Sequence, residues 1–277
     1  MLKARDANSE AESGSTAESG SNRIQVKICG LTRVSEALAC AELGAAAIGC
    51  VFYPPSPRFV SDEQARAICS ALPEWVVPVG VFVDEDFDTV MRRVERCGIR
   101  MAQLHGRESP ELAARLERAG VGVIKAVFIN RDPRFDQVGQ FPAARAFLAE
   151  CAGGRLPGGN ALAWDWSVAR GITGNRPLVL AGGINAETVA EALSAARPDA
   201  LDLSSGVEAA PGRKDLDKVA RFLDRVSRCR PDYHPRGAFA PPVLGRGGPG
   251  GTAGHPERAS SSGRRVMAPV HEGHILG

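Results

Sequence analysis

The sequence lacks any dense block of lysine and arginine: 34 basic residues nearly balance 32 acidic ones, and the formal net charge is +2. Nucleic-acid-binding proteins usually carry a concentrated basic surface. The sequence therefore favours a small molecule over a nucleic acid as ligand. Its apolar runs also fall short of the roughly 18 to 20 residues that a membrane-spanning helix needs, so we expect no membrane span.

The sequence has seven cysteines but no C-x-x-C pair. An odd number of cysteines, scattered over mostly apolar segments, is typical of reduced thiols in a cytoplasm. Residues 1–22 are rich in Ser, Glu, Ala and Gly, and they lack the apolar core of a secretory signal. We therefore expect a cytoplasmic protein that begins with a disordered tail over residues 1–22.

Histidine is scarce, and four of the five histidines follow residue 229: His234, His255, His271 and His274. Residues 230–277 contain much Gly, Pro, Arg and Ser and few large apolar residues, which predicts a disordered low-complexity tail. Its histidines have no metal-ligand spacing, so we predict no metal site. An enzyme built on residues 23–229 must draw its acid and base from Cys, Asp, Glu, Lys or His105.

Short β-branched runs alternate with amphipathic stretches between residues 23 and 229, which is the pattern of βα units around a parallel sheet. We predict strands at 24–29, 47–53, 76–83, 100–104, 121–128, 145–149, 177–181 and 200–203. We predict helices at 34–43, 62–72, 86–97, 109–119, 186–196 and 214–228, with the fifth and sixth of eight helices poorly marked. Eight such units predict a single α/β domain, a (β/α)8 TIM barrel.

A doubly wound open sheet is the main competing architecture. Such a sheet normally has a G-x-G-x-x-G motif after its first strand, whereas here that strand is followed by Gly30, Leu31 and Thr32. The barrel is therefore preferred, and it predicts that functional groups lie at the C-terminal ends of the strands.

Small residues follow the seventh and eighth predicted strands: Gly182 and Gly183, then Ser204, Ser205 and Gly206. Paired glycines often do no more than make tight turns. Two such loops on successive strands of a barrel, however, allow backbone N–H groups to approach a phosphate. A helix that starts near residue 185 would add the positive end of its dipole. These five residues are the predicted phosphate site.

Cys29 ends the first predicted strand, where the alternation points Lys27 and Cys29 to the same side. A lone cysteine is more often a small buried hydrophobic residue. At a barrel mouth, nearby N–H groups or cations could lower its pKa and allow the thiolate to act as a base.

Six segments resemble phosphoribosylanthranilate isomerases, and the likeness runs in order from about residue 24 to 228: VKICGLTR (26–33), GCVFYPPSPR (49–58), GVFV (80–83), QLHG (103–106), LAGGI (180–184) and SSGVE (204–208). The resemblance implies a cofactor-free Amadori rearrangement in tryptophan biosynthesis. It converts N-(5-phosphoribosyl)anthranilate to 1-(2-carboxyphenylamino)-1-deoxyribulose 5-phosphate, so the partner is a phosphosugar.

The resemblance makes Cys29 the general base, which takes the C2 proton of the opened sugar. The family's general acid is an aspartate at the end of strand six, where this sequence has Glu150. The segment Asp165–Ser167, fifteen residues on, resembles the family's F-D-W-S and supports this placement. The extra methylene of a glutamate shifts the carboxyl by about 1 Å, and a displacement of that size can cost roughly a hundredfold in rate.

The resemblance also implies substrate-binding residues. Arg58 has the family position that holds the anthranilate carboxylate, a task suited to a bidentate guanidinium. Gln103 and His105 border the substrate, His105 in an orienting or structural role. Asp202 lines the pocket near the phosphate loops, either in direct contact or through another group.

Two other enzymes share the barrel. Histidine-pathway sugar isomerases perform a similar Amadori step with aspartates at strand ends, but the first strand here ends in Cys29. Indole-glycerol-phosphate synthase needs catalytic Lys and Glu residues that these strand ends do not offer. A third hypothesis is a catalytically impaired barrel that acts as a phosphosugar-binding or scaffolding protein. The oligomeric state is left open as monomer or homodimer.

Overall fold

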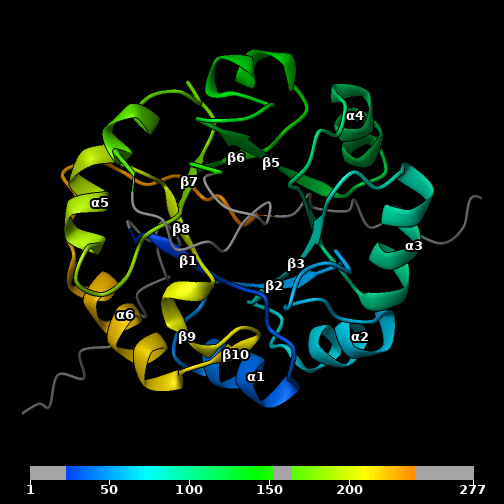
Figure 1. Ribbon diagram of the computed structural model, residues 1–277, viewed down its shortest axis with the longest axis horizontal. Coiled ribbons are helices and arrows are strands. Elements are labelled where there is room, and N and C mark those ends of the chain that lie inside the picture. The colour runs from blue at the N-terminus through cyan, green and yellow to red at the C-terminus, as the bar shows by residue number, and fades with distance from the viewer. Residues whose placement is uncertain (1–22, 153–163, 241–277) are drawn as a thin grey trace, which may run out of the picture. The chain divides into compact units, whose positions relative to one another are not determined.

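The computed structural model describes residues 23–152 and 164–240. Eight parallel strands close into a barrel, since β1 pairs with both β2 and β8 (Figure 1). The strands are β1 (Gln25–Cys29), β2 (Ala47–Val51), β3 (Val77–Phe82), β4 (Met101–Leu104), β5 (Gly122–Phe128), β6 (Ala146–Glu150), β7 (Leu178–Ala181) and β8 (Ala200–Leu203). The predicted (β/α)8 barrel is confirmed, and each strand boundary lies within two residues of its prediction.

The described part of the chain has six α-helices around the barrel: α1 (Val34–Glu42), α2 (Asp62–Ala71), α3 (Phe87–Cys97), α4 (Pro110–Arg118), α5 (Val189–Ala196) and α6 (Leu216–Arg228). Side-chain caps fix several of their starts. The Ser61 hydroxyl accepts the amide of Gln64, whose side chain accepts the amide of Ser61 in return. Asp86, Ser109 and Asp215 cap α3, α4 and α6 in the same position.

The two poorly marked helices are absent from the described residues. Short 3₁₀ turns stand in their places: η1 (Phe135–Gln140) between β5 and β6, and η2 (Trp166–Ala169) between β6 and β7. A third turn, η3 (Ser205–Val207), leads from β8 into an antiparallel hairpin of β9 (Glu208–Ala210) and β10 (Arg213–Lys214). Where the structure describes these two connections, the weak helical pattern thus corresponds to 3₁₀ turns.

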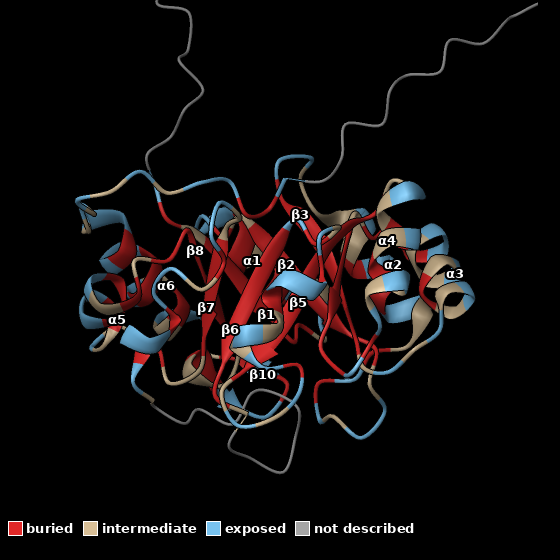
Figure 2. Ribbon diagram, turned by 90° about the horizontal axis from the view of Figure 1, so that it is seen from above, coloured by how far each residue is buried: buried red, intermediate tan, exposed pale blue. Residues whose placement is uncertain are grey.

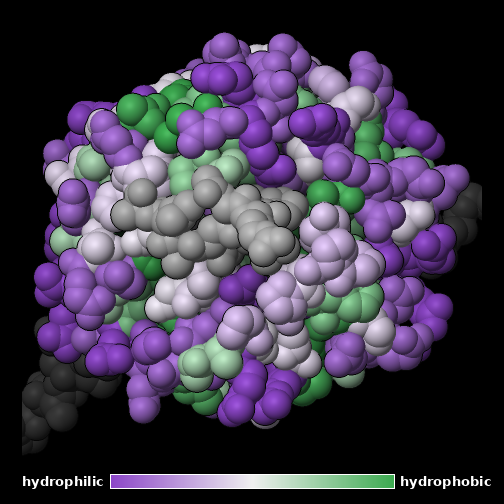
Figure 3. Space-filling view, viewed as in Figure 1, coloured by the Kyte–Doolittle hydropathy of each residue, from purple (hydrophilic) through white to green (hydrophobic). Residues whose placement is uncertain are grey.

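The barrel strands are buried on both faces, while the helices expose their outer faces (Figure 2). Hydrophilic residues accordingly dominate the rim seen in Figure 3. Side chains that point into the barrel fill most of its interior: Ala47, Val79, Met101, Ile124, Ala126, Leu148 and Val179 are all fully buried. Above them Cys29, Val51 and Val81 form a separate small cluster at the C-terminal ends of their strands. Side chains thus pack the interior of the barrel, and Cys29 lies near its C-terminal mouth.

The domain boundary that we predicted at residue 229 is wrong for residues 230–240. Ala238 and Phe239 join the cluster that fills the barrel, with 2% and 4% of their surface exposed. Their amides donate to Oε1 of Gln25 at the start of β1, 2.8 and 3.0 Å away. Arg236 pairs with the buried Asp199. The composition of this stretch indicated disorder, but two apolar residues and one arginine suffice to hold it against the barrel. Residues 1–22 and 241–277 lie outside the described residues.

Candidate active site

One pocket lies at the C-terminal ends of the strands, and all eleven predicted site residues line it: Cys29, Arg58, Gln103, His105, Glu150, Gly182, Gly183, Asp202, Ser204, Ser205 and Gly206. Because these ends meet at one mouth of a parallel barrel, residues up to 177 positions apart become neighbours.

Cys29 sits where β1 and β2 meet. Lys27, on the same face of β1, is fully buried and its Nζ lies 2.9 Å from Oδ1 of Asp202, its register partner on β8. The space for both side chains comes from Gly49 on β2: a Cβ there would lie 2.9 Å from the Cys29 sulfur and 3.1 Å from Cε of Lys27. A residue larger than glycine would displace the sulfur or the lysine.

Burial and the neighbouring lysines shift the pKa of Cys29 in opposite directions. Burial raises the pKa of the Cys29 thiol, while the ammonium groups of Lys27 and Lys214 act to lower it, and the net direction is upward. Burial also acts to lower the pKa of Lys27, but Asp202 and Cys29 outweigh it, so the pKa of Lys27 is raised. A fixed cation therefore lies beside the sulfur, ready to stabilise a thiolate.

Glu150 ends β6 on the pocket wall, with its Oε2 3.3 Å from Nε2 of His105. The other ring nitrogen of His105 is 3.0 Å from Nε2 of Gln103. If the amide N–H of Gln103 donates to Nδ1, the ring carries its proton on Nε2 and donates it to Glu150. The three side chains thus form one hydrogen-bonded row that fixes the carboxyl.

Contacts with Lys125 and Glu108 hold the loop that carries His105. Nζ of the buried Lys125 on β5 contacts Oε2 of Glu108 at 2.6 Å and the carbonyl of Gly106 at 2.8 Å. Glu108 also accepts the amides of Gly106 and Asp84. The peptide next to His105 is therefore fixed by a buried ion pair, although burial lowers the pKa of Lys125 more than Glu108 raises it.

Arg58, on the loop after β2, is 6% exposed. Its stem lies on Gly30, where a Cβ would come 2.5 Å from Cδ of the arginine; φ there is +79°, which also favours glycine. Its guanidinium makes two hydrogen bonds to Glu208, from Nε at 2.9 Å and from Nη2 at 2.7 Å.

The two predicted phosphate loops approach each other closely. A Cβ on Gly206 would lie 2.6 Å from the carbonyl oxygen of Ile184, so the contact requires glycine. The indoles of Trp164 and Trp166 donate to the carbonyls of Ala181 and Gly182, each at 3.0 Å, and brace the end of β7. The segment Asp165–Ser167 supported the placement of Glu150, but its sequence did not indicate that indole groups brace β7.

The predicted helix start near residue 185 is wrong: α5 begins at Val189. The Asn185 side chain instead accepts the amides of Glu187 and Thr188, each at 2.9 Å, and forms a turn ahead of the helix. The positive end of the α5 dipole therefore lies farther along the chain than we expected.

Sequence analysis also missed Glu208 and Lys214. Both are buried, and Nζ of Lys214 lies 2.8 Å from Oε1 of Glu208. Glu208 stands in the SSGVE segment, but nothing local showed that its partner is Arg58, 150 positions earlier. Within residues 23–152 and 164–240, no group of three or more His, Cys, Asp or Glu residues could hold a metal ion, and no disulfide joins any of the seven cysteines.

The family model for N-(5'-phosphoribosyl)anthranilate (PRA) isomerase matches residues 26–225. The chain belongs to this family. The PRA isomerase of Desulfatibacillum aliphaticivorans is 57% identical over 217 residues, which cover 78% of this chain and 99% of the relative. That of Acidithiobacillus ferrooxidans is 42% identical over 203 residues, 73% of this chain and 97% of the relative.

Solved PRA isomerases have the same fold. The structure from Thermus thermophilus matches with a TM-score of 0.66 at 42% identity, over 74% of this chain and 98% of that chain. A PRA isomerase in complex with reduced 1-(o-carboxyphenylamino)-1-deoxyribulose 5-phosphate (rCdRP) matches with a TM-score of 0.65 at 37% identity and the same coverage.

None of the helices in the described part of the chain has the length and hydrophobicity of a membrane span.

Proposed function

We propose that this chain converts N-(5'-phosphoribosyl)anthranilate to 1-(2-carboxyphenylamino)-1-deoxyribulose 5-phosphate, a step of tryptophan biosynthesis. The observation that carries the proposal is the joint placement of a thiol and a carboxyl, Cys29 and Glu150, in one pocket with two glycine- and serine-rich loops and an arginine. Relatives bearing this activity in their names share up to 57% of their residues with the chain.

Glu150 is the proposed general acid. Opening the furanose ring needs a proton on the ring oxygen, and its transfer from Glu150 leaves a protonated Schiff base between C1 and the anthranilate nitrogen. His105 is the proposed positioning residue, since its Nε2 lies 3.3 Å from the carboxyl. Gln103 in turn holds the other side of the ring.

Cys29 is the proposed general base. The Schiff base acidifies the C2 proton, and the Cys29 thiolate removes it to give an enaminol. The Cys29 thiol then returns a proton to C1 and the Glu150 carboxylate takes the enol proton, which gives the amino ketone and restores both groups. Lys27, held by Asp202, stabilises the negative sulfur during this step, so Asp202 acts here through the lysine.

Binding is proposed to use two separate groups on the pocket wall. The loops at Gly182–Gly183 and at Ser204–Gly206 offer backbone N–H groups to the substrate phosphate. Arg58 receives the anthranilate carboxylate. Arg58 and Lys214 each pair with Glu208, and the three charges sum to one positive charge. An unbalanced buried cation is expected next to an anionic ligand.

Loss of substrate fluorescence in the purified protein, with freshly generated phosphoribosylanthranilate, tests this proposal. We expect Cys29→Ala to abolish turnover while rCdRP still binds. Glu150→Gln is expected to lose roughly 100- to 10,000-fold in kcat, and Glu150→Asp to keep or improve it. A wild-type protein that binds rCdRP without turnover, and does not restore growth of a tryptophan auxotroph lacking this isomerase, would instead support the binding or scaffolding hypothesis.

We also propose a cytoplasmic enzyme that is a monomer or a homodimer. One relative of known structure, from Thermotoga maritima, is described as dimeric. Light scattering of the full chain measures the mass directly, and cell fractionation tests the location.

A further inference from the structure

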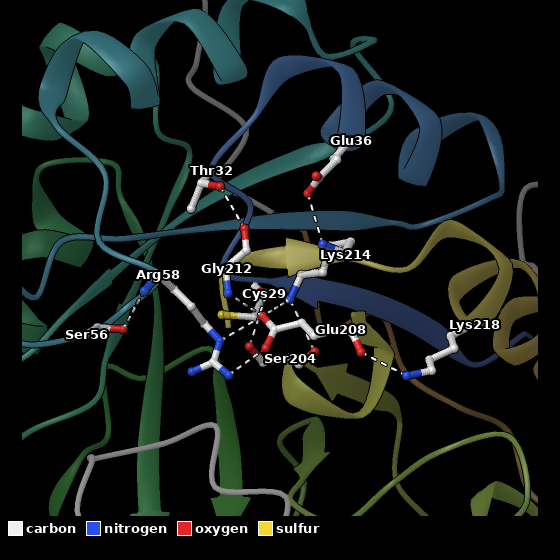
Figure 4. Close-up of polar contacts among 10 residues, drawn as sticks. All are labelled: Cys29, Thr32, Glu36, Ser56, Arg58, Ser204, Glu208, Gly212, Lys214 and Lys218. Atoms are coloured by element: carbon white, nitrogen blue, oxygen red, sulfur yellow. Dashed lines mark hydrogen bonds and ion pairs between the residues drawn. The ribbon is translucent and has the colours of Figure 1, made fainter. Parts of the chain in front are cut away.

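Glu208 accepts four hydrogen bonds beside the pocket residue Arg58 (Figure 4). It begins β9, two residues beyond the phosphate loop, and is 8% exposed. Oε2 accepts Nη2 of Arg58, while Oε1 accepts Nε of Arg58, Nζ of Lys214 and the amide of Gly212. Burial acts to raise the pKa of Glu208, but the hydrogen bonds from Arg58 and the charge of Lys214 outweigh it and lower it. Glu208 is therefore held as a carboxylate.

The pair with Arg58 is side-on, because it uses Nε and Nη2 of the guanidinium. The pair does not use the other edge of the guanidinium, which is formed by Nη1 and the second hydrogen of Nη2. We call this the end-on edge. No described residue accepts a hydrogen bond from Nη1. Arg58 lines the pocket, and a guanidinium can hold a second carboxylate at its end-on edge while the first occupies its side.

The backbone on both sides restricts Arg58 to this orientation. Gly30 lies under its stem, and the hairpin tip presses on the preceding residue: a Cβ on Gly212 would lie 2.8 Å from the carbonyl oxygen of Pro57. The hairpin is itself anchored, since Thr32 donates to the carbonyl of Gly212 at 2.8 Å and Glu36 accepts the amide of Lys214 at 3.0 Å. The Glu208 carboxylate thus comes from a rigid support.

Lys214 links the same carboxylate to the phosphate loop. Its Nζ is 3.2 Å from the carbonyl of Ser204 as well as 2.8 Å from Glu208. Ser204 also donates from its hydroxyl to the carbonyl of Cys29 at 3.2 Å. Glu208 is therefore joined to the phosphate loop and to Arg58 through one set of hydrogen bonds.

We propose that Glu208 is a positioning residue that turns the end-on edge of Arg58 into the pocket, and so makes the enzyme select substrates with a carboxylate on the aromatic ring. This inference rests on the proposed function, because it takes Arg58 as the carboxylate contact. The alternative is that Glu208 only balances the charge of Arg58 and Lys214. Positioning and charge balance predict opposite results when the carboxylate is neutralised.

The test compares two ligands by calorimetry: rCdRP, and the same reduced sugar phosphate with a phenylamino group that lacks the carboxylate. We expect the wild type to prefer rCdRP by roughly 10- to 100-fold, the range for a hydrogen bond between charged groups. Glu208→Gln removes the negative charge and the side-on pair at nearly constant size. We expect this variant to reduce the preference to about threefold or less, with affinity for the phenylamino ligand within about twofold of the wild type.

Two variants make the comparison specific. Glu63→Gln removes an exposed carboxylate that pairs with Arg96 at 2.6 Å, and it should leave the preference unchanged. Glu208→Asp keeps the charge for Lys214 but shortens the side chain, so we expect an intermediate preference. If Glu208→Gln fails to fold, as near-ultraviolet circular dichroism would show, the aspartate variant decides, and a preference equal to that of the wild type would overturn the inference.

An equal or stronger preference for rCdRP in Glu208→Gln would also overturn it, because charge balance alone predicts that removing the negative neighbour strengthens carboxylate binding. Turnover of phosphoribosylanthranilate by the wild type tests the proposed function separately. An active wild type with an unchanged ligand preference in Glu208→Gln would contradict the role of Glu208 and leave the proposed function intact.

Discussion

At Cys29, burial and charge act on the thiol in opposite directions. Burial raises its pKa and Lys27 lowers it, with a net rise above the ordinary value of about 8.5. A cysteine can act as a base only in its thiolate form. The thiolate fraction of Cys29 therefore increases as the pH rises toward the raised pKa, and it is small at neutral pH.

We predict that the rate at which iodoacetamide carbamidomethylates Cys29 rises with pH from 7 to 9 without reaching a plateau, at close to tenfold per pH unit, because only the thiolate reacts. Mass spectrometry of the Cys29 peptide at each pH measures this rate. A plateau below pH 8 would contradict a raised pKa for this thiol.

At the scale of elements, the loop between β4 and α4 depends on one buried ion pair. The side chains of Lys125 and Glu108 are 0% and 1% exposed, and Glu108 receives two backbone amides besides the ammonium. Removing one charge of such a pair leaves the other buried without compensation. The loop that presents His105 to Glu150 is therefore sensitive to a residue that does not line the pocket.

We predict that Glu108→Gln lowers the free energy of unfolding by about 3 to 5 kcal/mol, measured by urea denaturation at pH 7. It should also lower kcat, because the peptide next to His105 loses its support. Glu95→Gln, which neutralises an exposed carboxylate on α3, is the matched control and should change stability by less than about 0.5 kcal/mol. Equal stability of the two variants would show that the pair does not hold the loop.

The strands could be predicted because their pattern is local: β3 is a run rich in valine, and β7 is a short apolar run between Pro177 and Gly182. The candidate site followed, since the barrel brings strand ends together: Cys29 and both loops came from that rule, and the role of Glu150 came from the family resemblance. The pairing of Arg58 with Glu208 could not be predicted, because it joins residues 150 positions apart through side chains alone. The start of α5 was misplaced by three residues, because a polar side chain such as Asn185 can accept backbone amides in a turn as well as at the start of a helix.

At the scale of the whole molecule, the end of the barrel opposite the pocket is closed by residues 230–240. Phe239 is 4% exposed among residues of the barrel interior, and the guanidinium of Arg236 makes two contacts of 3.0 Å or less with the carboxylate of Asp199. Composition suggested that this stretch contributes nothing to the domain. Its contacts indicate that it contributes to stability at a distance from the chemistry.

We predict that Phe239→Ala lowers the free energy of unfolding by about 3 to 5 kcal/mol, the usual cost of removing a buried aromatic ring, while kcat/KM of the folded enzyme at 25 °C stays within about twofold. Thermal unfolding followed by circular dichroism measures the first effect. Trp75→Ala, at a ring that is 60% exposed, should leave Tm nearly unchanged. Unaltered stability in Phe239→Ala would mean that the barrel does not need this closure.

The hairpin of β9 and β10 follows directly after the loop proposed to hold the phosphate, and it supplies the carboxylate that holds Arg58. A single stretch of eleven residues, Ser204 to Lys214, therefore sets the separation between the two anionic groups that a substrate can present. An insertion anywhere in this stretch would change that separation, and with it the length of the molecules the enzyme accepts, while leaving the thiol and the carboxyl where they are.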